Sequence, residues 1–158
     1  MVKKHFKLTS AVYAIFTQRE DILLLRRSNT GYEDGKYSLV AGHLDGGEFP
    51  TDAMIREARE EAGVTLHTED LRCVHVMHRL IEGDERMDLF FEVIQWEGTV
   101  QNAEPHKCSD LRWFPINDLP SNTIPYICSA IAHYKNKIFF SEFAERTHKK
   151  YPTAMVDR

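Results

Sequence analysis

The most informative part of the chain consists of two nearby segments, Gly42-His43-Leu44-Asp45-Gly46-Gly47-Glu48 and Arg56-Glu57-Ala58-Arg59-Glu60-Glu61-Ala62-Gly63-Val64. Between them, residues 50–52 (Pro-Thr-Asp) predict the start of a helix, because proline is favoured in a first helical turn. We expect this helix to stop at Gly63, since glycine is favoured just past a helix end. At about 100° per residue, Met54, Ile55 and Ala62 lie within roughly 60° of Ala58 and form the expected buried stripe.

Three glutamates share one side of this expected helix, next to the buried stripe. Relative to Ala58, Glu61, Glu57 and Glu60 lie at roughly −60°, −100° and −160°, an arc of about 100°. Glu57 neighbours both other carboxylates, and each like-charge pair costs a few tenths of a kcal/mol. A solvated helix face is one interpretation of this cluster. A divalent cation is the other, because Mg²⁺ and Mn²⁺ prefer clustered oxygen ligands.

Residues near the glutamates complete the expected cation site. Arg56 lies one turn before Glu60 and can pair with it, which would hold that carboxylate in place. The three glycines between residues 42 and 47 permit close backbone approach, so a carbonyl of this loop is a further candidate ligand.

The spacing of these residues resembles that of the Nudix hydrolase family. At about 5 to 7% usage per residue type, seven fixed identities coincide on the order of once in 10⁹ start positions. The family pattern is G-x5-E-x7-R-E-U-x-E-E-x-G-U, with U apolar or small, and it is matched at every fixed position by Gly42, Glu48, Arg56, Glu57, Ala58, Glu60, Glu61, Gly63 and Val64.

The resemblance implies an α/β/α sandwich around a mixed β-sheet, and hydrolysis of a nucleoside diphosphate linked to another moiety. It also implies a role for each matching residue. Those roles are metal binding or water activation for Glu57, Glu60 and Glu61 with Arg56 beside them, a carbonyl metal ligand for Gly42, and structural support of the motif for Glu48 and Gly63.

Outside the motif, residues 111–115 (Leu-Arg-Trp-Phe-Pro) resemble the small MutT-type members, which cleave nucleoside triphosphates to a monophosphate and pyrophosphate. The human oxidised-purine nucleotide hydrolase has a tryptophan, a proline and two aspartates just after this strand. Residues 124–127 of this chain read Ile-Pro-Tyr-Ile instead. The acids that read the base in that enzyme are therefore absent, and oxidised guanine is not the expected base.

Four further residues are candidates for the site. Arg26 and Arg27, at the end of an expected strand, could meet phosphates, or they could form a solvated rim. Glu104 and Asp110 lie in the loop before Trp113, from which some Nudix enzymes take a base or an extra ligand, although a solvated loop acid explains them equally well.

Apolar and polar alternation around these segments predicts a mixed sheet with helices on both faces. We expect one globular domain over residues 1–158. Residues 141–158 show no clear period of apolar residues, so no secondary structure is assigned to them. The expected strands cover residues 8–17, 22–26, 37–41, 64–80, 86–96 and 111–114, and a second helix, capped by Asn122-Thr123, carries Ile127, Ile131, Tyr134 and Ile138 on one stripe.

Composition narrows the functional class further. The chain has 158 residues, 42% of them hydrophobic, so it can form a packed core. Its net charge of −4 argues against holding nucleic acid through the overall field. The three cysteines form no C-x-x-C pair, which indicates a reducing, cytoplasmic location, and no apolar run reaches the ~18 residues of a membrane span.

The sequence thus predicts a Mg²⁺-dependent pyrophosphohydrolase of free nucleotides, with a small-molecule nucleotide as its partner and Mn²⁺ as an alternative ion. The sequence does not determine the oligomeric state, and a homodimer is one alternative. Two alternatives stay open as well: a Nudix hydrolase of nucleotide sugars, dinucleoside polyphosphates or RNA 5′ ends, and a nucleotide-binding module without catalysis.

Overall fold

The computed structural model describes residues 4–81 and 84–144, and all structural statements refer to these residues. In chain order its elements are β1 (Thr9–Gln18), β2 (Asp21–Arg27), β3 (Tyr37–Ser38), β4 (Val40–His43), α1 (Pro50–Ala62), the short 3₁₀ helix η1 (Thr68–Asp70), β5 (Leu71–Ile81), β6 (Asp84–Val93), β7 (Cys108–Pro115), α2 (Pro125–Lys135) and β8 (Phe140–Ala144).

The strands form one mixed sheet with the order β3-β2-β1-β6-β5-β8, while β4 pairs with β1 and β7 pairs with β2. Strands β1 and β6 are parallel, as are β5 and β8. The other pairings are antiparallel. The expected mixed sheet is therefore confirmed.

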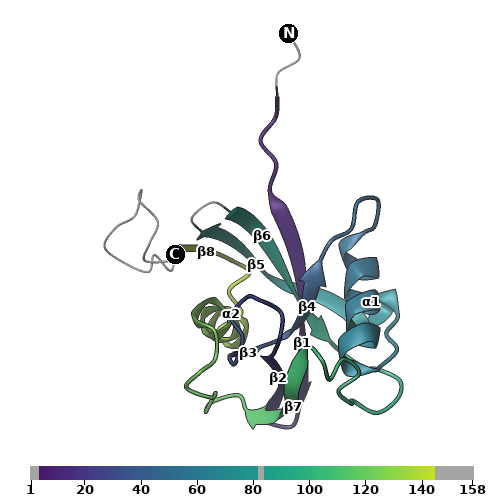
Figure 1. The fold of residues 1–158 in the computed structure, drawn as a ribbon. Helices are drawn as coiled ribbons and strands as arrows, with labels where there is room; N and C mark the ends of the chain where they lie inside the picture. The colour runs from purple at the N-terminus through teal and green to yellow at the C-terminus, as the bar shows by residue number, and fades with distance from the viewer. Residues whose placement is uncertain (1–3, 82–83, 145–158) are drawn as a thin grey trace.

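The two longer helices cover opposite faces of this sheet (Figure 1). Alternate residues of β1 supply the two cores, because successive strand side chains point to opposite faces. Val12, Ala14 and Phe16 pack with α1, whereas Tyr13 and Ile15 pack with α2. This arrangement is the α/β/α sandwich that the sequence predicts.

Helix α1 has the predicted bounds and buried face. Pro50 occupies its first turn, and it ends at Gly63, which adopts φ 68° and donates its N–H to the Arg59 carbonyl. The helix buries its predicted stripe except for Ile55, which is half-buried, and also buries Ala53.

All six expected strands have somewhat different bounds in the structure, and two of them differ most. The strand expected over residues 64–80 begins only at Leu71, because the preceding residues form η1, where the Asp70 carboxylate accepts the His67 N–H at 2.7 Å. The strand expected over residues 37–41 is two short strands: β3 pairs with β2, and β4 pairs with β1. Pairing with different partners, rather than local sequence, separates them.

The second helix is shorter than expected and lacks the expected cap. Its N-cap is Ile124, without a side-chain cap bond, so Asn122 and Thr123 do not cap it. It ends at Lys135, and Ile138 lies beyond it. Lys137 adopts φ 56°, a left-handed conformation that turns the chain out of the helix. β8 then follows within the stretch for which the sequence indicated no period. No helix in the described part of the chain is long and apolar enough to span a bilayer.

Candidate active site

Glu61 is the most deeply buried of the three glutamates on α1. Its Oε2 accepts the backbone N–H of Ala41 on β4 at 2.9 Å. Among the described residues, no cationic side chain forms an ion pair with it. Burial raises the pKa of Glu61 to about 8, and the nearby charge of Glu57 adds to the shift. A buried carboxylate with such a shifted pKa is typical of a functional site.

Glu57 and Glu60 lie progressively closer to solvent. The Glu57 side chain is 12% exposed and that of Glu60 is 50% exposed. Burial also raises the pKa of Glu57, although Arg56 opposes the shift. Strand β4 packs directly against this carboxylate, since a Cβ placed on Gly42 would overlap it.

Arg56 connects the loop after β4 to the helix. Its Nη2 donates to Glu48 Oε1 at 2.8 Å and to the His43 carbonyl at 3.2 Å, while its Nη1 donates to Glu57. The expected pair with Glu60 is present at 3.7 Å between Nη1 and Oε2. Glu48 also accepts the Asp45 N–H at 2.7 Å, so it ties the loop to the helix.

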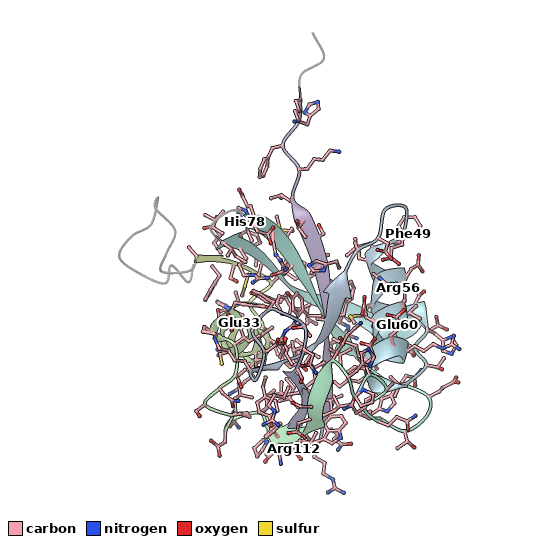
Figure 2. The ribbon with its side chains drawn as sticks, in the orientation of Figure 1. Glu33, Phe49, Arg56, Glu60, His78 and Arg112 are labelled. Atoms are coloured by element: carbon pink, nitrogen blue, oxygen red, sulfur yellow. The ribbon has the colours of Figure 1, made fainter. Side chains whose placement is uncertain are left out.

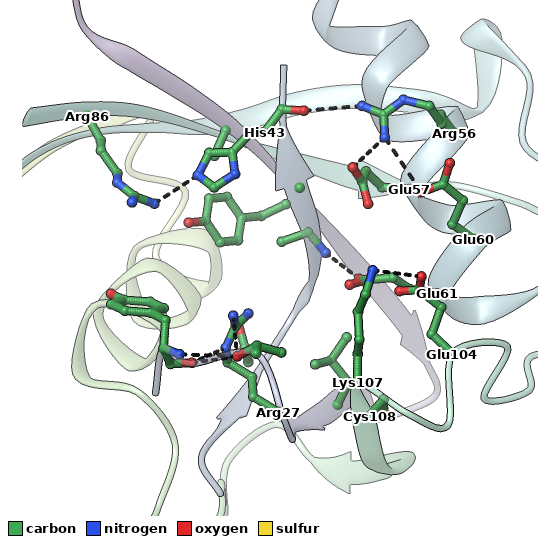
Figure 3. A pocket seen from close by; sticks show the side chains of 18 of the residues that line it. Arg27, His43, Arg56, Glu57, Glu60, Glu61, Arg86, Glu104, Lys107 and Cys108 are labelled. Carbon is green, nitrogen blue, oxygen red and sulfur yellow. Dashed lines mark hydrogen bonds and ion pairs between the residues drawn. The ribbon is translucent and has the colours of Figure 1, made fainter. Parts of the chain in front are cut away.

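The three glutamates of α1 and Arg56 line a cleft of about 550 Å³. Figure 3 shows Glu57, Glu60 and Glu61 on one side of the cleft, with Lys107 and Glu104 next to Glu61. Arg86 and His43 lie on another side, and Arg27 lies apart from both groups. Besides the glutamates of α1, the cleft is lined by Glu104 and by the cationic side chains of Arg27, Arg56, Arg86 and Lys107. It therefore combines oxygen ligands for a cation with positive groups for an anionic substrate.

Of the two arginines proposed from the sequence, only Arg27 lines the cleft. Arg26 instead donates from Nε to Ser109 Oγ at 2.9 Å on the neighbouring strand. The prediction that Arg26 contacts substrate thus finds no support in its position. Adjacent strand residues point to opposite faces, and only one of them can face the cleft.

The two candidate loop acids also differ in position. Glu104 lines the cleft and accepts a hydrogen bond from Lys107 Nζ at 3.0 Å. Asp110 does not line it; it accepts from the Tyr37 hydroxyl and pairs with Arg112 Nε at 2.9 Å. Arg112 lies at the end of the molecule near β7, away from Arg56 and Glu60 on α1 (Figure 2). Of these two loop acids, Glu104 alone lines the cleft and stays a candidate base or ligand.

The structure adds a set of residues that the sequence analysis did not identify. Tyr13, Tyr32 and Tyr126 line the part of the cleft toward α2. Behind them lies a fully buried ion pair between Arg79 and Asp88. The available signal was that Arg79 and Asp88 each lie two residues from a large apolar residue of the same strand, Met77 and Phe90, and so share its buried face, where unpaired charges are costly.

The model of the NUDIX domain matches residues 7–129 of the chain. The chain therefore belongs to the Nudix hydrolase family. The match covers the glutamates of α1 and the strands around them.

Curated relatives carry the name NAD-capped RNA hydrolase NudC. The protein of Stutzerimonas stutzeri is 30% identical over 118 residues, and one of Pseudomonas putida is 25% identical over 122 residues. Each match covers 75% of this chain but only 41% of the relative. The chain thus spans less than half the length of these relatives.

Solved structures support the fold. A MutT Nudix hydrolase from Burkholderia pseudomallei aligns with a TM-score of 0.73 at 23% identity, over 80% of this chain and 98% of that one. A MutT protein from Methanosarcina mazei aligns with a TM-score of 0.73 at 18% identity, over 85% and 98% of the two chains.

Members of this family generally use a divalent metal ion. Within residues 4–81 and 84–144, no three His, Cys, Asp or Glu side chains are arranged to hold one. The donors on α1 nevertheless fit a hard cation, because all are carboxylate oxygens. The buried Glu61 also lacks a positive partner among the described residues, a deficit that a bound cation would remove.

Proposed function

We propose that this enzyme hydrolyses a phosphoanhydride bond in a nucleoside diphosphate derivative with the aid of Mg²⁺, and that a nucleoside triphosphate, cleaved to the monophosphate and pyrophosphate, is its first substrate. The observation that carries the proposal is the buried carboxylate of Glu61, which forms no ion pair among the described residues and lies beside Glu57 in a cleft that also holds four cationic side chains.

Glu57, Glu60 and Glu61 are the proposed metal ligands, with the Gly42 carbonyl as a further one. A bound Mg²⁺ would supply positive charge to the phosphate oxygens and lower the pKa of the attacking water. Mn²⁺, with similar ligand preferences, is the proposed substitute.

The protein groups perform the remaining tasks. Arg27, Arg86 and Lys107 line the cleft and can bind phosphate oxygens. A carboxylate must accept the proton of the attacking water, and Glu57 and Glu104 are the candidates because both line the cleft. Arg56 keeps Glu57 in position through the contact of Nη1 with its carboxylate.

The test is an assay of the full chain with Mg²⁺ on free nucleoside triphosphates, dinucleoside polyphosphates and nucleotide sugars, with identification of the products. Release of pyrophosphate from a triphosphate supports the proposal. Binding of nucleotides without turnover would indicate a binding module instead. The proposed location is the cytoplasm, where the three free cysteines would stay reduced.

A second candidate substrate is the NAD cap of RNA, or NAD itself. The name of the curated relatives favours it, and NAD also contains a phosphoanhydride bond between two nucleoside halves. Against it, the net charge of −4 provides no general attraction for RNA. Including NAD and NAD-capped RNA in the same panel decides between the two candidates.

A further inference from the structure

The part of the cleft toward α2 is lined by three tyrosines from different elements: Tyr13 on β1, Tyr32 in the loop after β2, and Tyr126 on α2. They differ in exposure. Tyr13 and Tyr126 are 3% and 4% exposed, whereas Tyr32 is 36% exposed. Only Tyr32 therefore presents a large part of its surface to a ligand.

The rings of the two buried tyrosines are already in use within the protein. Tyr13 stacks on Phe90, with centroids 4.6 Å apart and planes at 16°. The guanidinium carbon of Arg79 lies 3.6 Å from the centroid of Tyr126 and covers that ring. Neither ring is available as a stacking surface on those faces.

Tyr32, by contrast, stacks on no other aromatic ring in the described part of the chain. Two guanidinium carbons lie near it, those of Arg27 at 5.4 Å and of Arg86 at 6.0 Å from its centroid. Both distances fall within the roughly 6 Å range of a cation–π contact, so the two arginines lie over the ring while Tyr32 keeps 36% of its surface exposed. Both arginines line the cleft, and guanidinium groups also pack on nucleobases.

Hydrogen bonds at the backbone carbonyl and at the side-chain hydroxyl hold Tyr32 in position. Its carbonyl accepts from Arg27 Nε at 2.7 Å and from Thr30 Oγ1 at 3.0 Å. Its hydroxyl accepts from Arg79 Nη1 at 3.4 Å. Arg79 is itself held by Asp88, whose Oδ2 lies 2.8 Å from Nε. Little conformational entropy therefore has to be lost when a ligand packs on this ring.

We propose that Tyr32 is the platform on which the aromatic base of the nucleotide stacks. The inference rests on the proposed function and deepens it. Stacking tolerates any base, because every base has a π face. Tyr32 should therefore select substrates that carry a base over substrates that do not, rather than one base over another.

The test compares wild-type protein with Tyr32→Leu, Tyr32→Phe and Tyr32→Trp. Phe139→Leu is a matched control, because Phe139 is 58% exposed and does not line the cleft. Binding of AMP, CMP and ribose 5-phosphate is titrated by NMR, which requires no turnover. For each nucleoside triphosphate that is hydrolysed, KM and kcat are measured separately.

We expect Tyr32→Leu to weaken binding of AMP and CMP by about tenfold or more, the usual effect of losing one base stack. KM should rise in parallel, with kcat little changed. Tyr32→Phe and Tyr32→Trp keep an aromatic face and should stay within about threefold of wild type, less than the loss of a stack. Ribose 5-phosphate should bind equally to all variants, and Phe139→Leu should behave as wild type.

Unchanged AMP and CMP binding by a folded Tyr32→Leu protein would overturn the inference. So would base-proton resonances that show no upfield ring-current shift on binding to wild type, a measurement that does not depend on any variant folding. Absence of turnover on every substrate would contradict the proposed function alone, because the binding data decide the role of Tyr32 independently.

Discussion

The side chains of Arg79 and Asp88 form an ion pair that has no exposed surface on either partner, with Nε and Oδ2 2.8 Å apart. Strands β5 and β6 bring them together at the sheet face that α2 covers. Among the described residues, the second carboxylate oxygen of Asp88, Oδ1, has no hydrogen-bond partner. Burying two charges is expensive, and such pairs contribute little net stability. We therefore regard the pair as a support for the tyrosines of the cleft.

Removing one member of this pair should be far more costly than removing both. Arg79→Met would leave Asp88 buried without its cation, and we expect a loss of about 3–5 kcal/mol in the free energy of unfolding. The double variant Arg79→Met/Asp88→Leu should recover most of this loss. Urea unfolding of the three proteins measures the difference. Equal stabilities of the single and double variants would contradict this account.

Replacement of Glu61 should separate stability from activity. Glu61→Gln removes a carboxylate that is costly to ionise in its buried site but keeps an oxygen to accept the Ala41 N–H. We expect thermal unfolding without metal at a Tm at least equal to that of wild type. Turnover should fall by more than the roughly 10–100-fold typical of residues that only support a metal ligand. Near-normal rates in the folded variant would refute its role as a ligand.

Replacement of Arg56 tests whether the orientation of Glu57 depends on the guanidinium fork. Arg56→Lys retains the charge but cannot contact Glu48, Glu57 and the His43 carbonyl together. We expect a loss of about 10–100-fold in turnover or Mg²⁺ affinity. Arg59→Lys, on the exposed side of the same helix, is the control and should behave as wild type. Equal effects of the two changes would show that charge alone matters.

Gly42 should tolerate no side chain while Glu57 keeps its position. A Cβ there would overlap the carboxylate, so Gly42→Ala must push Glu57 aside. Because the displaced group is the end of a flexible side chain, we expect the fold to persist and Mg²⁺ affinity to drop, as isothermal titration would show. Gly46→Ala meets no atom within 4 Å and serves as the control. If Gly42→Ala bound Mg²⁺ as tightly as wild type, the claim that a side chain at residue 42 displaces Glu57 from the metal site would be wrong.

Asp70 should contribute a pH-dependent part of the stability. The His67 N–H and the Gln95 side-chain amide hold the pKa of Asp70 below its usual value. Because the pKa of Asp70 is lower in the folded state, its carboxylate adds to the free energy of unfolding at any pH above its unfolded-state pKa of about 3.9. This contribution is lost as the pH falls through the folded-state pKa of Asp70. Asp70→Asn should therefore be less stable than wild type near pH 7, with a difference that shrinks in acid.

Urea unfolding between pH 3 and pH 7 measures this difference. Glu69→Gln, at the exposed neighbouring position, is the control and should follow wild type across the range. If the difference in the free energy of unfolding between Asp70→Asn and wild type grew as the pH fell, the prediction would be contradicted.

Local sequence patterns correctly predicted those structural features that depend only on residues close together in the chain. The bounds of α1 follow from Pro50 and Gly63, whose backbone preferences act within one turn. The position of Glu61 beside the core follows from helix periodicity. Residues 64–70 were assigned wrongly to a strand, because the side-chain bond of Asp70 that forms η1 gives no signal in apolar alternation.

The spacing of residues 42–64 was enough to predict the family. Helix and strand periods were enough to predict the mixed sheet between two helices and the row of glutamates on α1, because such periods place residues without knowledge of their partners. The folded structure was needed to show that Arg27 rather than Arg26 faces the cleft, and that Tyr13, Tyr32 and Tyr126 line it in front of the buried Arg79. These residues are far apart in the chain, and their contacts depend on strand register and on the packing of α2, which no local pattern encodes.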